Sequence, residues 1–419
     1  MSQRAARRHD LCVVVTGVGV VSPYGRDCQA YWQGLSQGQC TLGPLSLFPT
    51  DGFRSNIGGE VNAAIVRTLG KAHRSRATRF LLTAAEEAVG HAGLGTAELA
   101  TAAVSIGGAG GGMLEAETWY WARYHHRQEG LRPAPTQSRQ RRQLVALPSM
   151  TPAAQTDALA CKLRIGGPRE SPILACSSSA AAIATVADLI ETGVVEVGLA
   201  GGVDTLTRLC FMGFNALKLL DTQPCRPFAR DRRGMSLGEG AAVLVLESWR
   251  HAAARGAPIR ACVAGCGLSS DALHPTAPPS DAEGAVRAMR EALARACLTP
   301  ADIAYVNAHG TGTMQNDRAE AVALETVFGA GKVLVSATKS LIGHTMGAAG
   351  ALEVVATILA LESGLLPPTA NLWEPDPAIP FDCIPRVARP CSLACAMSNS
   401  FGFGGQNVSL IMLHPDVIR

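Results

Sequence analysis

Short apolar runs and amphipathic stretches alternate along this chain in two successive rounds. The apolar runs are rich in valine and isoleucine, which are typical of buried strands. In the stretches between them apolar residues recur every three or four positions, as on the buried face of a helix. Buried strands alternating with helices predict an α/β architecture, and two such rounds suggest a pseudo-duplicated one.

The two rounds divide the chain near residue 256. In the first round we expect strands over residues 11–21, 102–106, 195–200 and 241–247, and helices over residues 28–35, 76–92, 150–161 and 177–190. In the second we expect strands from residue 259 and over 303–306 and 333–337, and helices over 285–296, 317–328 and 347–362. Runs at 392–400 and 408–413 close the chain as an antiparallel-looking pair. We therefore predict an N-terminal half of residues 1–256 and a C-terminal half of residues 257–419.

Two regions stand apart from this pattern. Residues 113–150 are the least regular part of the sequence, and we expect a surface excursion there. Residues 107–112 form a glycine-rich turn after a predicted strand, but the spacing lacks G-x-G-x-x-G followed by an acid about 20 residues on. A dinucleotide-binding loop is therefore disfavoured.

Charge and hydropathy exclude several classes of partner. A formal charge of +3 is too weak to argue for nucleic acid. No apolar stretch reaches the roughly 18–20 uncharged residues needed to span a bilayer. The arginines of residues 1–10 precede an apolar run, as in a signal peptide, but Gly17 and Gly19 interrupt that run and no small-residue cleavage site follows. We expect a first core strand there instead.

The 13 cysteines include no C-x-x-C pair and no histidine at ligand spacing, so we predict no metal site. An odd number of cysteines, many of them in apolar runs, indicates free thiols in a reducing cytoplasm. We therefore expect a cytoplasmic protein.

One of these cysteines lies at a predicted junction. Residues 171–190 read as a short strand that breaks at Cys176 and continues as a helix. A thiol at a helix start experiences the positive end of the helix dipole, which lowers its pKa and makes it a candidate nucleophile. The alternative is that Cys176 is a small buried apolar residue.

Further along the chain, residues 307–313 (NAHGTGT) and 339–345 (KSLIGHT) each place a histidine in a glycine-rich turn after a strand-like run. Residues 399–405 (NSFGFGG) add a third glycine-rich turn. With Cys176, these motifs closely resemble the β-ketoacyl-acyl-carrier-protein synthases, the condensing enzymes of the thiolase superfamily. The resemblance runs from Val15 to Ile411.

The resemblance implies a five-layer αβαβα thiolase fold whose two halves meet at the catalytic centre. It implies that Cys176 accepts an acyl group from an acyl carrier protein and that His309 and His344 stabilise the enolate of malonyl thioester after loss of CO₂. The backbone N–H groups of Cys176 and Phe403 would form the oxyanion hole, and Phe403 would also gate the pocket. No cofactor is implied beyond the phosphopantetheine of the carrier.

Other residues are assigned by the same resemblance. Lys339 and Glu353 would form a supporting ion pair. Because acyl carrier proteins are acidic, basic residues near the pocket mouth would bind them, and we select Arg74, Arg141 and Lys218.

Three positions depart from the family pattern. Asn316 replaces a common glycine and would need a left-handed backbone, Gln406 replaces a threonine, and Leu174 occupies a position where threonine is common. The departures favour a specialised polyketide or polyene pathway over housekeeping fatty acid synthesis.

Two alternatives remain open. The chain could be a partner subunit of the chain-length-factor type, or an acyltransferase that does not decarboxylate. Acyl chain length, and homodimer or heterodimer formation with a homologous chain, are not determined by the sequence.

Overall fold

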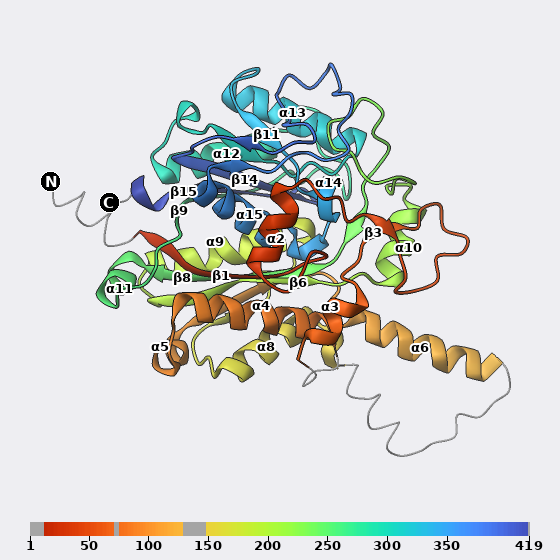
Figure 1. Ribbon diagram of the computed structural model, residues 1–419, viewed down its shortest axis with the longest axis horizontal. Coiled ribbons are helices and arrows are strands. Elements are labelled where there is room, and N and C mark those ends of the chain that lie inside the picture. The colour runs from red at the N-terminus through yellow and green to blue at the C-terminus, as the bar shows by residue number, and fades with distance from the viewer. Residues whose placement is uncertain (1–11, 71–74, 129–147, 418–419) are drawn as a thin grey trace, which may run out of the picture.

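The computed structural model describes residues 12–70, 75–128 and 148–417 (Figure 1). The main strands are β1 (Val13–Val21), β4 (Ala103–Gly107), β5 (Arg169–Glu170), β6 (Val197–Asp204), β8 (Gly240–Ser248), β9 (Ala261–Ser270), β10 (Tyr305–Asn307), β11 (Leu334–Ser336), β14 (Cys395–Gly402) and β15 (Gln406–Leu413). The main helices are α2 (Cys28–Ser36), α4 (Arg76–Ala92), α5 (Thr96–Thr101), α6 (Met113–Gln128), α8 (Pro152–Leu163), α9 (Ser178–Glu191), α10 (Arg208–Ala216), α12 (Glu283–Ala296), α13 (Met314–Phe328), α14 (Lys339–Ile342) and α15 (Ala349–Ser363).

These ten strands form one sheet that is built twice in the same order. From its centre outward, the first half runs β1-β8-β6-β4-β5 and the second runs β9-β15-β14-β10-β11. In each half the first three strands pair antiparallel and the remaining pairings are parallel. The halves join where β1 pairs antiparallel with β9, with Val13 opposite Val263. The fold is therefore a mixed α/β fold with an N-terminal and a C-terminal half.

Helices cover both halves of the sheet (Figure 1). Helices α4, α5 and α8 lie outside the first half, α12 and α13 lie outside the second, and α9 and α15 lie between the halves. The central helices are apolar almost all round, and α15 is buried along most of its length. A helix that is apolar on every face is stable only in such an interior position.

Glycines allow the outer helices to approach the first strand of each half closely. A Cβ on Gly19 would lie 1.9 Å from the carbonyl oxygen of Ala84 in α4, and a Cβ on Gly267 would lie 1.9 Å from that of Ala288 in α12. Because no side chain fits at such a distance, these positions require glycine.

Most predicted elements are confirmed. Helix α4 has the predicted bounds, and β14 and β15 pair antiparallel as expected. Residues 113–128 extend away from the core in Figure 1, as expected of a surface excursion, but they form a helix, α6, that the sequence did not predict, because it lacks the apolar stripe of a packed helix. One prediction is wrong. No strand leads directly into Cys176, because the preceding strand, β5, ends at Glu170.

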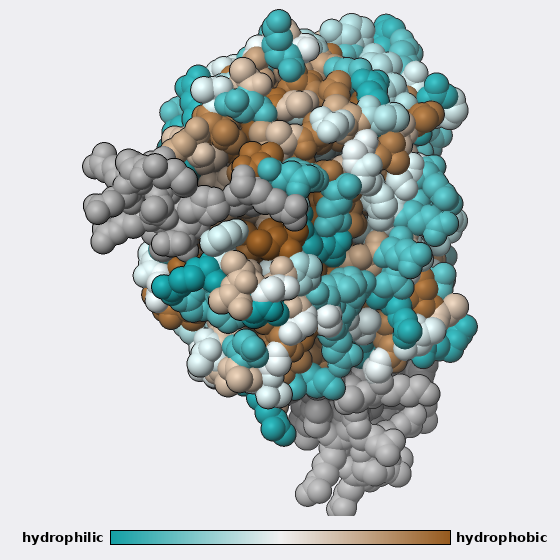
Figure 2. Space-filling view, turned by 60° about the vertical axis from the view of Figure 1, so that its left-hand side comes forward, coloured by the Kyte–Doolittle hydropathy of each residue, from teal (hydrophilic) through white to brown (hydrophobic). Residues whose placement is uncertain are grey.

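One segment, Met346–Ser363, is as long and as apolar as a membrane-spanning helix, but 89% of it is buried inside the protein. It is the core helix α15 with the turn before it. On the face shown in Figure 2, hydrophilic and hydrophobic residues are interspersed.

We predict that Gly19→Ala lowers the free energy of unfolding by about 1–3 kcal/mol, because its methyl group forces α4 away from β1. Gly90→Ala is the matched control, since Gly90 lies in α4, the helix that packs on Gly19, and a Cβ on Gly90 meets nothing within 4 Å. That change should stabilise the protein by about 0.5–1 kcal/mol. Urea denaturation measures both, and equal effects would contradict the close packing of β1 on α4.

Candidate active site

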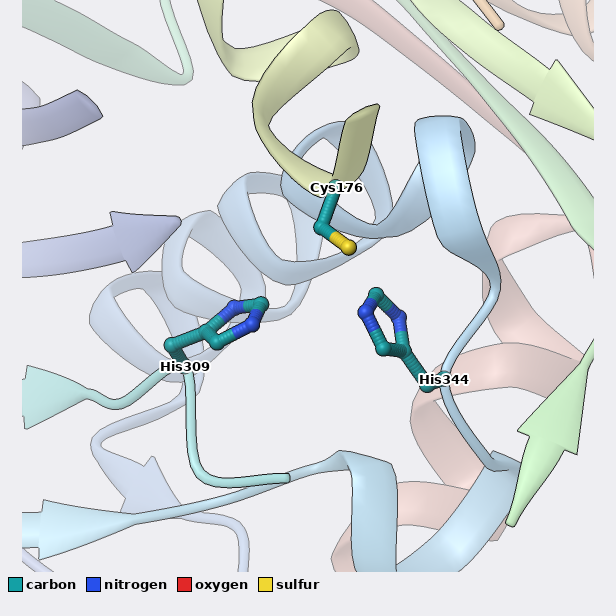
Figure 3. Close-up of side chains that lie close together, drawn as sticks. All are labelled: Cys176, His309 and His344. Atoms are coloured by element: carbon teal, nitrogen blue, oxygen red, sulfur yellow. The ribbon is translucent and has the colours of Figure 1, made fainter. Parts of the chain in front are cut away.

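Cys176 lies on a sharp turn at the start of the central helix α9. A single 3₁₀ turn, η2 (Ala175–Ser177), leads into α9, and Ala175 adopts a left-handed backbone with φ +48°. The Ser178 hydroxyl accepts a hydrogen bond from Leu174 N–H at 2.9 Å and so fixes this turn. The Cys176 side chain is buried and projects from the turn (Figure 3).

The two predicted histidines lie opposite this thiol. His309 follows β10, and His344 follows α14 in the loop before α15. Figure 3 shows both rings turned toward the cysteine. The sulfur and a nitrogen of each ring lie within 4.8 Å of one another, and the ring centroids are 5.3 Å apart at 85°. The structure thus brings together three residues from both halves of the chain.

Hydrogen bonds define the tautomer of each ring. The Nζ of Lys339 lies 3.2 Å from Nδ1 of His309, and the backbone N–H of Met346 donates to Nδ1 of His344, also at 3.2 Å. A nitrogen that accepts a hydrogen bond carries no proton in a neutral imidazole, so the proton lies on Nε2 in both rings. Nε2 of His344 is buried and has no partner within the described structure. It is therefore a donor available to a ligand.

Burial also keeps both imidazoles neutral. It lowers the pKa of His309 and of His344 well below the usual value, and the charge of Lys339 lowers both further. The two rings are therefore hydrogen-bond donors without a positive charge.

The pKa of the Cys176 thiol is shifted in the direction opposite to the one that the sequence predicts. Burial raises the pKa of Cys176 to about 11, although the charge of Lys339 and a hydrogen bond from Phe403 N–H act to lower it. We expected the helix start to lower this pKa. Burial of the sulfur outweighs the favourable groups around it.

Lys339 and Glu353 form the expected ion pair. The ammonium group contacts Oε1 of Glu353, and both side chains are at most 3% exposed. Burial raises the pKa of Glu353 to about 7, and the neighbouring ammonium group acts to lower it. Lys339 therefore connects Glu353 to the ring of His309.

Buried carboxylates that the sequence did not single out hold the surrounding loops. Glu320 accepts hydrogen bonds from His309 N–H and Gly310 N–H, both at 2.8 Å. Asp204 accepts from the loop after His344, at Gly347. Their sequence signal is weak, because acids on helices and at strand ends are usually solvated.

Phe403 lies in the third glycine-rich turn. Its N–H acts to lower the pKa of the Cys176 thiol, and its half-buried ring stacks on Phe214 with centroids 5.8 Å apart. The next residues, Gly404 and Gly405, have φ values of +82° and +75°. Only glycine adopts such angles without strain, which explains this run.

A pocket leads to the three residues. Its walls include Thr311, Thr313 and the turn at Gly402–Gly405, together with exposed residues such as Gln315. A substrate entering by this route meets the thiol and both rings at its inner end.

The structure locates the three positions that depart from the family pattern and one of the three basic residues selected for carrier binding. Asn316 lies in the first turn of α13 with an ordinary backbone, so the expected left-handed conformation is wrong; Thr313 caps that turn instead. Gln406 begins β15, and Leu174 is half-buried beside Cys176. Lys218 is exposed next to the pocket residue Leu219. Arg74 and Arg141 lie outside the described residues.

Cys176, His309 and His344 are close enough to bind a metal ion. Metal-bound histidines usually donate their other ring nitrogen to a carboxylate or carbonyl, which increases their basicity. Here that nitrogen of His309 faces the ammonium group of Lys339. A cation at this position opposes metal binding, so we assign no metal.

Relatives of known name match nearly the whole chain. Nodulation protein E of Rhizobium sp. (strain N33) is 38% identical over 411 residues, covering 96% of this chain and 98% of that protein. The 3-oxoacyl-(acyl-carrier-protein) synthase 2 of Synechocystis sp. (strain ATCC 27184 / PCC 6803 / Kazusa) is 35% identical over 413 residues, covering 95% and 97%.

Solved structures are similar to this chain over nearly the same length. The ishigamide ketosynthase/chain length factor is 34% identical with a TM-score of 0.89, covering 96% of this chain and 99% of that one. A ketosynthase in complex with its type II PKS acyl-carrier protein is 28% identical with a TM-score of 0.85 and the same coverage. Residues 12–252 match the family description "Beta-ketoacyl synthase, N-terminal domain", and residues 260–373 match "Beta-ketoacyl synthase, C-terminal domain". The chain therefore belongs to the β-ketoacyl synthase family.

Proposed function

We propose that Cys176 receives an acyl chain and that His309 and His344 direct its condensation with malonyl thioester. As a β-ketoacyl synthase, the chain is a condensing acyltransferase of fatty acid or polyketide elongation. The observation that carries the residue assignment is the convergence of one thiol and two neutral Nε2–H donors at the end of one pocket.

In the first step, the sulfur of Cys176 attacks the carbonyl carbon of an acyl thioester. The carrier's pantetheine thiol leaves with the proton that the cysteine loses, so the step needs no net acid or base. The backbone N–H groups of Cys176 and Phe403 stabilise the oxyanion of the tetrahedral intermediate. Lys339 and Phe403 N–H assist formation of the thiolate, because both lower the thiol pKa against burial.

In the second step, malonyl thioester loses CO₂ and the electron pair forms an enolate. The two Nε2–H groups donate to the enolate oxygen, and their neutrality leaves the enolate nucleophilic enough to react. The enolate carbon attacks the acyl group on Cys176, the thiolate leaves, and the product is two carbons longer. Loss of one such donor typically costs about 10²–10³-fold in rate.

This geometry favours condensation over the two alternatives. A partner subunit that only shapes a pocket needs no aligned thiol, and a transferase that does not decarboxylate needs no paired donors. Here Nε2 of His344 is a buried donor that finds no partner among the described residues, a costly arrangement unless a ligand oxygen accepts from it.

For the architecture, we propose the five-layer αβαβα arrangement, with a duplication that gave halves of residues 1–256 and 257–419. The matching strand order and the matching glycine contacts in β1 and β9 support it. Because the structure shows no disulfide among the described cysteines, we also propose a reducing, cytoplasmic location.

For partners, we propose an acyl carrier protein that supplies phosphopantetheine thioesters, and a homodimer or a heterodimer with a homologous chain. Lys218 and the exposed Leu217 offer charge and apolar surface near the pocket. The short strand β5 is an edge of the sheet that the described residues form, and an edge strand can pair with a second chain. The departures at Leu174 and Gln406 lead us to propose a polyketide or polyene pathway.

We predict that Cys176→Ala abolishes both acyl uptake and chain extension, whereas His344→Ala retains acyl uptake and loses extension by about 10²–10³-fold. Intact mass of the protein with acyl carrier measures uptake, and product mass with malonyl carrier measures extension. Acyl uptake at another residue in Cys176→Ala would overturn the assignment of the nucleophile.

We predict that Lys339→Met costs about 3–5 kcal/mol of stability, because it leaves the buried carboxyl group of Glu353 without its partner. The double variant Lys339→Met/Glu353→Leu is the control, since it removes both charges. It should recover most of the loss in a urea denaturation series. Equal stability of the single variant and the wild type would show that the pair is not needed to bury Glu353.

A further inference from the structure

Asp204 ends β6 in the N-terminal half, and its carboxylate is completely buried. Its oxygens accept hydrogen bonds from two loops that are far apart in the sequence. Gly110 N–H donates to Oδ1 at 2.7 Å, and Ala109 N–H donates to Oδ2 at 3.0 Å. Gly347 N–H, from the C-terminal half, donates to Oδ2 at 2.6 Å. One carboxylate thus binds the glycine-rich turn at 107–112 to the loop that carries His344.

The bond to Gly347 is directly connected to the ring of His344. Met346 and Gly347 are neighbours in one 3₁₀ turn, η4 (Met346–Ala348). Met346 N–H donates to Nδ1 of His344, and the next N–H along the chain donates to Asp204. Met346 has a left-handed φ of +50°, which a non-glycine residue adopts only when its surroundings hold it there.

Neighbouring segments pack closely around this turn. A Cβ on Gly347 would lie 2.7 Å from both Oδ2 of Asp204 and Cα of Gly108. A Cβ on Gly202 would lie 3.0 Å from the carbonyl oxygen of Gly347. The turn is therefore packed on both sides, and the hydrogen bond from Gly347 N–H connects it to Asp204.

We propose that Asp204 is a positioning residue for decarboxylation: through Gly347 and Met346 it holds His344 with Nε2–H directed at the substrate oxygen beside Cys176. This inference rests on the proposed function. It also couples the glycine-rich turn at 107–112 to the orientation of a catalytic ring, so a change in either loop is transmitted to the other.

Asp204 acts on the thiol in the opposite direction. Its charge raises the pKa of Cys176, as does that of Glu353, whereas Lys339 and Phe403 N–H lower it. Burial raises the pKa of Asp204 itself to about 6, and its three N–H donors act to lower it. Asp204 is therefore ionised at pH 7.5, and its neutralisation favours the thiolate.

The positioning of His344 and the effect on the thiol pKa act on different steps. The full-length variant Asp204→Asn should therefore change CO₂ release from malonyl carrier and acyl transfer to Cys176 differently. The amide loses at least one acceptor, so the turn shifts and His344 is misdirected. CO₂ release from malonyl carrier should fall about 10–100-fold, the range for a small misplacement of a catalytic group. Acyl transfer from acyl carrier to Cys176, measured by intact mass at pH 7.5, should be unchanged or faster.

Two further variants keep the test decisive. Gly347→Ala disturbs the same bond from the other side and should give the same split if Asp204→Asn does not fold. Glu87→Gln is the matched control, because Glu87 also accepts two backbone N–H bonds, from Val20 and Cys28, but lies on α4, the outer helix that packs on β1 and β8. It should leave both half-reactions unchanged.

A parallel fall of both half-reactions in Asp204→Asn, or no fall in either, would overturn the positioning role. Absence of CO₂ release from the wild type would instead overturn the proposed function, and this inference with it.

Discussion

The arrangement of the site depends on the contacts of one buried ammonium group, that of Lys339, with Glu353 and His309. A charge in the interior must be paired, and here Glu353 pairs with it while Nδ1 of His309 accepts from it. Together with burial, which is the larger cause, the same cation keeps both imidazoles neutral, and it partly offsets the cost of ionising Cys176. Lys339 thus defines the tautomer of His309 and lowers the pKa of both rings and of the Cys176 thiol.

The fold places Lys339, from the C-terminal half, near the thiol of Cys176, from the N-terminal half. Each half supplies one outer helix layer and one part of the sheet, and the central helices α9 and α15 begin beside each other at the active site. Glycines at the contacts permit approaches that any Cβ would prevent. Helix α9 begins beside Cys176, and the buried helix α15 carries Glu353, so the Lys339–Glu353 ion pair lies out of contact with solvent.

The sequence predicts the alternating elements, because periodicity is a local property, and it singles out Cys176, His309 and His344 because the motifs around them resemble those of a known family. It predicts Lys339 and Glu353 only through a family resemblance. It does not reveal Asp204 or Glu320, since their partners come from loops that only the folded chain brings near. The direction of the Cys176 pKa was wrong for the same reason: the helix start is local, whereas burial of the sulfur comes from distant segments. Helix α6 was missed because it has no core-facing stripe.

The central claim is that His309 and His344 present neutral Nε2–H donors to one point beside Cys176. Nitrogen-15 NMR of the ring nitrogens between pH 6 and pH 8 tests it most directly, with His309→Ala and His344→Ala for assignment. The expected result is that both rings stay neutral, with the proton on Nε2 throughout. Protonation of either ring near pH 7, or a proton on Nδ1, would contradict it.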